Sequence, residues 1–217
     1  MFSAGLDYGF KHDQMGIVIV STQRNIYETV DVIAEWRIDN QAHFSHQELA
    51  FGIVNWFKYQ AELRESPELK QGLWVYCDKS NPTYIEMLNS TAKQERLHWF
   101  RPSPQEEVQI RTYLRYTTNA ASVPRVLAFK QWLISSFKLN ISLEAPALYH
   151  ELKVATWDLK APKPRLAVGS LDHMMDAFDY ATITWYRKLM KGFNPYWLSK
   201  EVNLSRIIAK TSEGDAQ

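Results

Sequence analysis

The sequence predicts a mixed α/β fold, in which one β-sheet carries helices on both of its faces. Residues 1–36 alternate short apolar runs with polar turns, which is typical of three consecutive antiparallel strands. Beyond them, short apolar runs alternate with segments of helical periodicity, so later strands are reached through helices. The 217 residues, of which 46% are hydrophobic, are enough to fill the core of one such domain.

The first three predicted strands are residues 3–9, residues 15–20 and a strand that begins near residue 29. Polar turns at 11–14 and 22–25 separate them. The third strand alternates with period two, and its two faces are expected to carry Val30, Val32, Ala34 and Trp36 on one side and Thr29, Asp31 and Glu35 on the other.

A helix and a buried strand are predicted next. Ser45 and Glu48 form a capping-box pattern, and apolar residues then recur at helical spacing to about Leu63. The run 73–77 is short and continuously apolar, as expected for a strand buried on both faces, and it is followed by Asp78.

The same alternation is predicted to continue through the middle of the chain. Asn81 and Pro82 are residue types that favour an N-cap and a first helical position. The further predicted elements are a helix to about residue 89, a strand at 97–100, two helices between about 103 and 137 with a break at 119–124, a short strand at 139–143, a helix at 147–153 and an exposed loop with Pro162 and Pro164.

The last predicted helix runs from about Leu171 to Met190, with Ser170 or Asp172 as its expected N-cap. At about 100° per residue, one helix face is apolar and is expected to pack on the sheet through Met174, Phe178, Ala181 and Trp185. A different face gathers the polar and aromatic side chains His173, Asp176 and Tyr180. A histidine and an aspartate three residues apart on a helix can therefore both reach the same ligand.

Composition excludes several classes of protein. The single cysteine, Cys77, allows neither an internal disulfide nor a cysteine-based zinc site, which favours a reducing compartment. The sequence has no apolar run of about 18 residues and no signal-peptide pattern, so a soluble intracellular protein is expected. The net charge of +1 hides alternating segments, with −5 over residues 1–92, +5 over 93–138, −2 over 139–185 and +3 over 186–217.

Three aspartates are candidates for chemistry. Asp7 lies among apolar neighbours in the first strand, where a lone carboxylate is costly unless it is paired or binds a cation. Asp78 ends a buried strand, where α/β sheets form ligand crevices. Asp176 lies in the first turns of the last helix. Each also has a structural explanation: an exposed edge for Asp7, a cap or turn for Asp78, and a solvated face or surface pair with His173 for Asp176.

Four segments in order resemble one protein family. Asp172–Ala181 resembles the D-H-x-x-D-A-x-R-Y-A signature that closes the nuclease domain of the large terminase subunit of tailed bacteriophages, although Asp179 stands where arginine is usual. Gly5–Gly9 with Asp13, and Val75–Pro82, are similar to the family's two acidic strands. The stretch Pro146–Asp158 resembles its P-x-L-x-x-E-L-x-x-x-x-W-D segment through Leu148, Glu151, Leu152 and Trp157.

The resemblance covers residues 3–186, leaving the segment 112–123 unmatched. It implies a fold of the ribonuclease H-like, or retroviral-integrase-like, superfamily, which has the predicted element order. The nuclease domain would be residues 1–190, followed by a C-terminal tail, 191–217, that is partly ordered or serves in docking.

The resemblance also implies a set of site residues. Asp7, Asp78 and Asp176 would bind two divalent cations, Mg²⁺ or Mn²⁺, for phosphodiester hydrolysis. His173 would be an auxiliary ligand or proton-transfer group, with Asp13 and Asp172 as auxiliary acids. Basic residues that could contact the DNA backbone are Arg96, Arg101, Arg111, Arg115, Arg125, Lys130, Arg187, Lys188 and Lys191. Ordinary solvated helix faces are the alternative for these basic side chains.

The implied function is an endonuclease that cuts concatemeric double-stranded viral DNA during genome packaging, largely without sequence preference. It would act as a monomeric domain in the host cell cytoplasm, away from membranes. Its implied partners are the terminase ATPase domain, the portal and the small terminase subunit. The sequence has no G-x-x-x-x-G-K-[ST] phosphate-binding loop, so the ATPase half is not expected in this chain.

Two other functions fit the same residues. One is a different ribonuclease H-like nuclease, of the junction-resolvase or transposase type. The other is a catalytically inactive DNA-binding or assembly module that keeps the fold but not the chemistry. A junction resolvase would be a dimer that prefers four-way junctions, whereas a terminase nuclease would be a monomer that cuts linear or plasmid duplex DNA. An inactive module would show no divalent-metal binding that depends on Asp7 and Asp78.

Overall fold

A computed structural model of the chain describes most of its first hundred residues and several later segments. The described residues are 1–8, 14–22, 29–39, 43–70, 73–78, 82–94, 99–102, 133, 136, 138–155, 157–158, 165–166, 171–182 and 185. No helix among them is long and apolar enough to cross a membrane.

Six strands of the described chain form one mixed sheet, in the spatial order β5-β4-β1-β2-β3-β6. Their bounds are β1 (Phe2–Asp7), β2 (Gln14–Ser21), β3 (Val30–Asp39), β4 (Trp74–Cys77), β5 (Trp99–Pro102) and β6 (Leu139–Ile141). The first three strands pair antiparallel, β4 and β5 continue the sheet parallel to β1, and β6 pairs parallel with β3. The predicted meander followed by strands reached through helices is confirmed.

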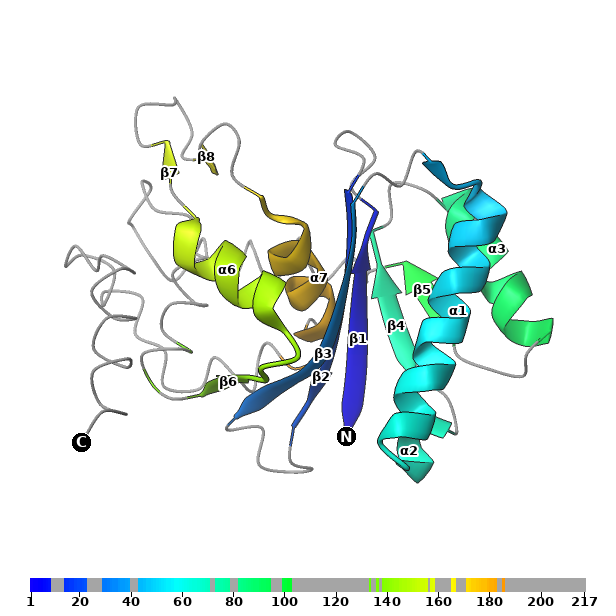
Figure 1. The fold of residues 1–217 in the computed structure, drawn as a ribbon, viewed down its shortest axis with the longest axis horizontal. Helices are drawn as coiled ribbons and strands as arrows, with labels where there is room; N and C mark the ends of the chain where they lie inside the picture. The colour runs from blue at the N-terminus through cyan, green and yellow to red at the C-terminus, as the bar shows by residue number, and fades with distance from the viewer. Residues whose placement is uncertain are drawn as a thin grey trace.

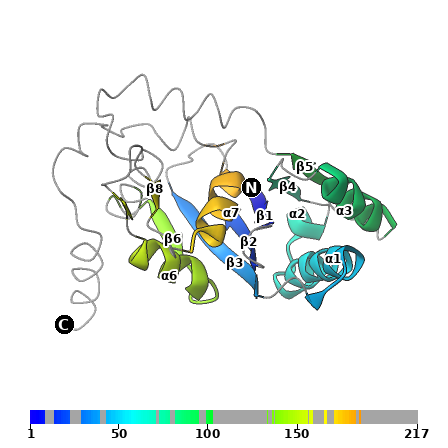
Figure 2. The same cartoon turned by 90° about the horizontal axis from the view of Figure 1, so that it is seen from above.

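Helices cover both faces of this sheet (Figures 1 and 2). One face carries α1 (His46–Leu63), α2 (Pro67–Lys70) and α3 (Pro82–Gln94), and the other carries α6 (Pro146–Val154) and α7 (His173–Thr182). The predicted capping box is present at α1, where the Ser45 hydroxyl accepts from the Glu48 N–H and the Glu48 carboxylate accepts from the Ser45 N–H.

The sheet separates two hydrophobic cores, and the side chains of β2 point alternately into one core and the other. Ile17 and Ile19 pack with α1 and α3 on one side, whereas Val18 and Val20 pack with α6 and α7 on the other. Strand β2 is therefore apolar without alternation because both of its faces are buried. The predicted apolar face is confirmed, since Met174, Phe178 and Ala181 of α7 are buried in the second core. Trp185 is buried there too, but it lies in a turn after α7, which ends at Thr182 and so is shorter than the predicted helix.

A β-bulge in β3 corrects the predicted alternation of that strand. Ile19 pairs with Ala34 and Val20 pairs with Val32, which leaves Ile33 as an extra residue. The bulge exchanges the two faces, so Val32 packs in the core beside α7 while Ala34 packs in the core beside α1. A strict period of two therefore describes only part of β3.

The bulge also creates a link between the two sides of the sheet. The guanidinium of Arg64, the C-cap residue of α1, donates to the carbonyl oxygen of Ile33 at 2.5 Å. It also pairs with the carboxylate of Glu144, in the turn before α6, at 2.7 Å. The carbonyl of the extra residue in the bulge is thus satisfied by the side chain that ends α1.

Other element boundaries differ from the sequence prediction. Strand β5 lies two residues later than predicted, α3 extends to Gln94 rather than ending near residue 89, and Trp74 in β4 is 40% exposed rather than buried. A short antiparallel pair, β7 (Trp157–Asp158) with β8 (Arg165–Leu166), was not predicted. The helices predicted within 103–137, the proline loop at 162–164, the segment 112–123, and the tail 191–217 with its domain boundary fall outside the described residues, apart from residues 133 and 136.

Candidate active site

Helix α7 lies directly against the backbone of β1 and β2 because two glycines leave room for it. A Cβ atom added at Gly5 would collide with the carbonyl oxygen of Ala177 and lie 2.5 Å from the nitrogen of Ala181. A Cβ added at Gly16 would lie 2.6 Å from the carbonyl oxygen of His173. The neighbouring atoms are mainly backbone, so they cannot move aside easily. Glycine is needed at these two positions for close approach.

This approach brings His173 to Asp7. Asp7 is the last residue of β1 and is 7% exposed, and His173 is the first residue of α7 and is 6% exposed. The Nδ1 atom of His173 lies 2.7 Å from the Oδ2 atom of Asp7. With the proton on Nδ1, the imidazole donates to the carboxylate. The sequence predicted that His173 could join the acidic site, but it did not predict this direct contact with Asp7.

Asp78 lies beside Asp7 because their strands are parallel neighbours. Leu6 of β1 is in register with Cys77 of β4, and the N–H of Asp78 donates to the carbonyl of Leu6 at 3.1 Å. The carboxyl ends of two adjacent strands therefore place the two aspartates at one edge of the sheet. Asp78 is half-buried. The predicted position of Asp78, at the end of a buried strand, is confirmed.

The electrostatics of Asp7 show a crowded acidic site. Burial raises the pKa of Asp7, and the nearby charges of Asp78 and Asp172 raise it further, while the hydrogen bond and charge of His173 oppose them. The hydrogen bond to Asp7 in turn raises the pKa of His173, against the effect of its own burial. The ionised form of Asp7 is therefore costly in the folded chain unless positive charge is close by.

Asp176 lies in the first turn of α7 and is half-buried. Among the residues that the structure describes, no three His, Cys, Asp or Glu side chains are gathered as a metal site. The structure places His173 in direct contact with Asp7, and Asp78 and Asp172 lie near enough to act on Asp7 electrostatically. The role of Asp176 as a third ligand stays a prediction.

The other predicted site residues are not placed. Asp13 and most of the predicted DNA-contacting residues fall outside the described residues, and of Arg101 only the strand backbone in β5 is described. The undescribed basic residues are Arg96, Arg111, Arg115, Arg125, Lys130, Arg187, Lys188 and Lys191.

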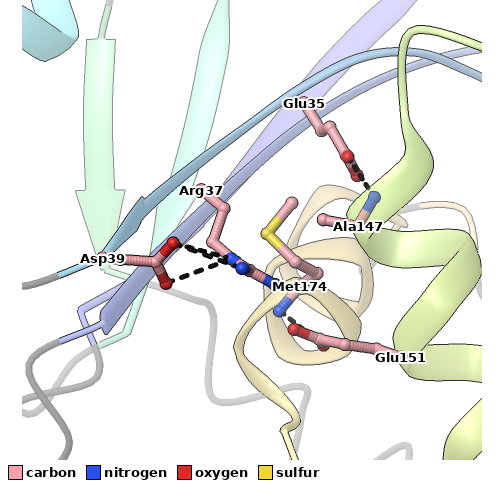
Figure 3. A network of polar contacts seen from close by, with 6 residues as sticks. All are labelled: Glu35, Arg37, Asp39, Ala147, Glu151 and Met174. Carbon is pink, nitrogen blue, oxygen red and sulfur yellow. Dashed lines mark hydrogen bonds and ion pairs between the residues drawn. The ribbon is translucent and has the colours of Figure 1, made fainter.

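Glu151 of α6 matched the family segment in the sequence, but it was not predicted as a site residue. Its side chain is fully buried, and its Oε2 atom accepts from the N–H group of Met174 at 2.9 Å (Figure 3). The same atom accepts from the N–H group of Met175 at 3.1 Å. These are donors of the first turn of α7. Asp172, one of the two predicted N-cap residues, directly precedes α7, and its carbonyl accepts from the N–H of Asp176. The carboxylate that accepts from Met174 and Met175 is nevertheless that of Glu151. The available signal was a glutamate within an otherwise apolar helix face.

The start of α6 is stabilised in the same way by Glu35 of β3. The Glu35 carboxylate accepts from the N–H of Ala147 at 2.5 Å and from the N–H of Leu148 at 2.8 Å (Figure 3). The N-cap residue of α6, Ala145, makes no side-chain cap of its own. Arg37, two residues after Glu35, forms an ion pair with Asp39 at 3.1 Å on the same strand. Side chains from earlier elements thus satisfy both helix starts.

Burial raises the pKa of both glutamates. The pKa of Glu35 is raised despite the opposing hydrogen bonds from Leu148 and Ala147 and the charge of Arg37. Burial raises the pKa of Glu151 to about 7, although the N–H groups of Met175 and Met174 act in the opposite direction. Oε1 of Glu151 is buried and has no hydrogen-bond partner among the described residues.

Comparison with known proteins identifies the fold. No protein-family model matches the sequence, and no curated protein matches it. The structure is similar to the nuclease domain of the large terminase from the bacteriophage SPP1 with bound Mn, at 20% identity and a TM-score of 0.51, covering 83% of this chain and 84% of that chain. It is also similar to Thermus thermophilus RuvC, at 10% identity and a TM-score of 0.45, covering 88% of this chain and 97% of that chain. The chain has the predicted ribonuclease H-like fold, and its resemblance to a terminase nuclease domain is confirmed at the level of the fold.

Proposed function

We propose that this chain is a metal-dependent endodeoxyribonuclease that hydrolyses phosphodiester bonds in double-stranded DNA. One observation supports the proposal most directly. Asp7 and Asp78 lie side by side at the ends of two adjacent parallel strands of a ribonuclease H-like sheet, and His173 contacts Asp7. The similar SPP1 domain is itself a nuclease domain with bound Mn. The similarity of the folds supports phosphodiester hydrolysis as the reaction, and the positions of Asp7 and Asp78 indicate where in the fold the active site lies.

The acidic residues fit a divalent cation. Burial raises the pKa of Asp7, and the charges of Asp78 and Asp172 raise it further, so a cation bound there would favour its ionised form. Carboxylate oxygens are the ligands that Mg²⁺ and Mn²⁺ prefer. We propose that Asp7, Asp78 and Asp176 bind two such ions. Bound ions of this kind activate a water molecule and stabilise the leaving oxygen in phosphodiester hydrolysis.

His173 has a role that follows from its contact with Asp7. Its Nδ1 atom lies 2.7 Å from the Oδ2 atom of the Asp7 carboxylate, and both residues are buried. A hydrogen bond of this type fixes the orientation of the carboxylate and supplies positive charge when the imidazole is protonated. We therefore assign His173 to orienting Asp7, with proton transfer as a further role.

The biological role that we propose is that of a phage large terminase. In that role the domain cuts concatemeric viral DNA during packaging, largely without sequence preference, in the host cell cytoplasm. The Asp172–Ala181 motif supports this role, as does similarity over 83% of this chain to one terminase nuclease domain. Its partners would be the terminase ATPase domain, the portal and the small terminase subunit, and the isolated domain would be a monomer.

Cleavage assays test the proposal. Purified protein should nick and linearise supercoiled plasmid with Mn²⁺ or Mg²⁺ and should lose this activity in EDTA. The Asp78→Asn variant, prepared in parallel, controls for contaminating nucleases. Intact plasmid under all metal conditions would contradict the nuclease assignment. Exclusive cutting of four-way junctions by a stable dimer would instead indicate the resolvase alternative.

A further inference from the structure

The first turn of α7 depends on a side chain from another helix. The N–H groups of Met174 and Met175 both donate to Oε2 of Glu151, which lies 23 and 24 positions earlier in the chain. Met174 directly follows His173, the residue that contacts Asp7. The position of the His173 backbone is therefore fixed from one side by the sheet at Gly16 and from another by Glu151.

Capping the start of α7 with the buried carboxylate of Glu151 lowers the stability of the fold. Its side chain is fully buried, and Oε1 lacks a hydrogen-bond partner among the described residues. Its neighbours include the charges of His173 and Asp172. A buried carboxylate with one oxygen unsatisfied lowers stability compared with a neutral side chain that makes the same contacts. A group with such a cost is a candidate for a functional role.

The carboxylate is itself placed by a second cap of the same kind. Glu35 of β3 accepts from the first N–H groups of α6, at Ala147 and Leu148. Glu151 lies one turn further along α6, facing α7. Two carboxylates thus connect the sheet to α6 and α6 to α7 (Figure 3). The second connection ends at Met174, the residue after His173.

We propose that Glu151 is a positioning residue, which keeps the first turn of α7 at the height where the His173 imidazole meets the Asp7 carboxylate. The inference rests on the proposed function for its importance in catalysis, but the geometry that it concerns exists in the protein without metal or DNA. Glu151 acts by the length and the acceptor oxygen of its side chain. Its charge is not what positions the helix.

Two variants separate position from charge. Glu151→Gln keeps the length and an acceptor oxygen but removes the charge, whereas Glu151→Asp keeps the charge and withdraws the carboxylate by one methylene group. The readout is the ring N–H signal of His173 in metal-free protein with ¹⁵N-labelled histidine. The chain has 6 histidines, and the His173 signal is assigned by its absence in His173→Gln. Wild-type protein should show a slowly exchanging Nδ1 proton.

Positioning predicts that Glu151→Gln keeps this signal and that Glu151→Asp increases its exchange by about tenfold, the factor expected for loss of one ordinary hydrogen bond. In DNA cleavage, Glu151→Asp should lower kcat with little change in KM, while Glu151→Gln stays close to wild type. Ser45→Ala is the matched control, because it removes a helix cap from α1 on the opposite face. It should lower the denaturation midpoint but leave the His173 signal unchanged.

Two results would overturn the inference. An unchanged His173 signal in Glu151→Asp would show that Glu151 does not position α7. A greater loss in Glu151→Gln than in Glu151→Asp would show that Glu151 acts through its charge. Because the signal is recorded without metal or DNA, it remains informative even for a protein that cuts no DNA, so failure of the nuclease assignment is recognised separately.

Discussion

Stability measured against pH in Glu151→Gln tests whether Glu151 is a buried acid. The fully buried carboxyl of Glu151 has its pKa raised from 4.5 to about 7, chiefly by burial. The folded protein therefore binds this proton more tightly than the unfolded chain does. The contribution of Glu151 to stability is fully present below pH 4.5 and is lost as the pH rises through about 7. Glutamine does not titrate, so the variant escapes this loss.

The size of the effect follows from the two pKa values. A pKa difference of 2.5, from 4.5 to about 7, corresponds to about 3 kcal/mol when the pH is above both values. Between about pH 5 and about pH 8.5, the free energy of unfolding of wild type should therefore fall by about 2 to 3 kcal/mol relative to Glu151→Gln. Titrating groups that do not interact with Glu151, such as Glu35, contribute to both proteins and cancel in the difference.

Urea denaturation of both proteins at several pH values measures this difference. Glu151→Gln should gain stability over wild type steadily as the pH rises, with most of the change between about pH 5 and pH 7. A difference between the two proteins that does not depend on pH would refute the reasoning. It would mean that water or local opening solvates the carboxylate at position 151, so that its burial does not disfavour the charged form.

Three further predictions concern the acidic site and its scaffold. Asp78→Asn should reduce metal-dependent cleavage by about 100-fold or more while keeping thermal stability equal or higher, because it removes a charge that crowds Asp7; cleavage near the wild-type rate would remove Asp78 from the site. His173→Ala should reduce cleavage less, by about 10- to 100-fold, as for a group that orients a ligand; a loss equal to that of Asp78→Asn would make it an essential ligand. Gly5→Ala should cost about 1–3 kcal/mol in urea denaturation because its Cβ meets the backbone of α7. Gly52→Ala is its control, with only a 3.5 Å contact and a gain in helix propensity, and equal effects of the two changes would refute the close approach.

Local periodicity predicted much of the fold. The capping box at Ser45, the apolar strand before Asp78 and the apolar face of α7 all depend on residues within a few positions of one another. The two dipeptide strands β7 and β8 are too short to show any period, so they were missed. The bulge at Ile33 was missed because it depends on the partner strand and on Arg64, which lies 31 positions away.

The candidate site was predicted only in part, because local sequence patterns do not show contacts between distant residues. The position of Asp78 at a strand end follows from local pattern. Asp7 was predicted inside a strand of residues 3–9, but it is the last residue of β1. The contacts of both residues depend on how distant elements pack. A buried glutamate that caps a helix 23 residues later leaves no local spacing to detect. The sequence thus predicted which residue types form the site, but it did not predict the hydrogen bonds that orient their side chains.

The pairing of Asp7 with His173 has a consequence for how the domain acquires activity during folding. The two residues are 166 positions apart, and the helix that carries one of them must pack over the strand that carries the other. Contacts of such long range close the largest loops of the chain and form late. A partly synthesised or partly folded chain therefore contains the acids of the first strands without the histidine that completes them. In an incomplete chain Asp7 lacks its contact with His173, so the proposed site is complete only after α7 has packed on β1 and β2.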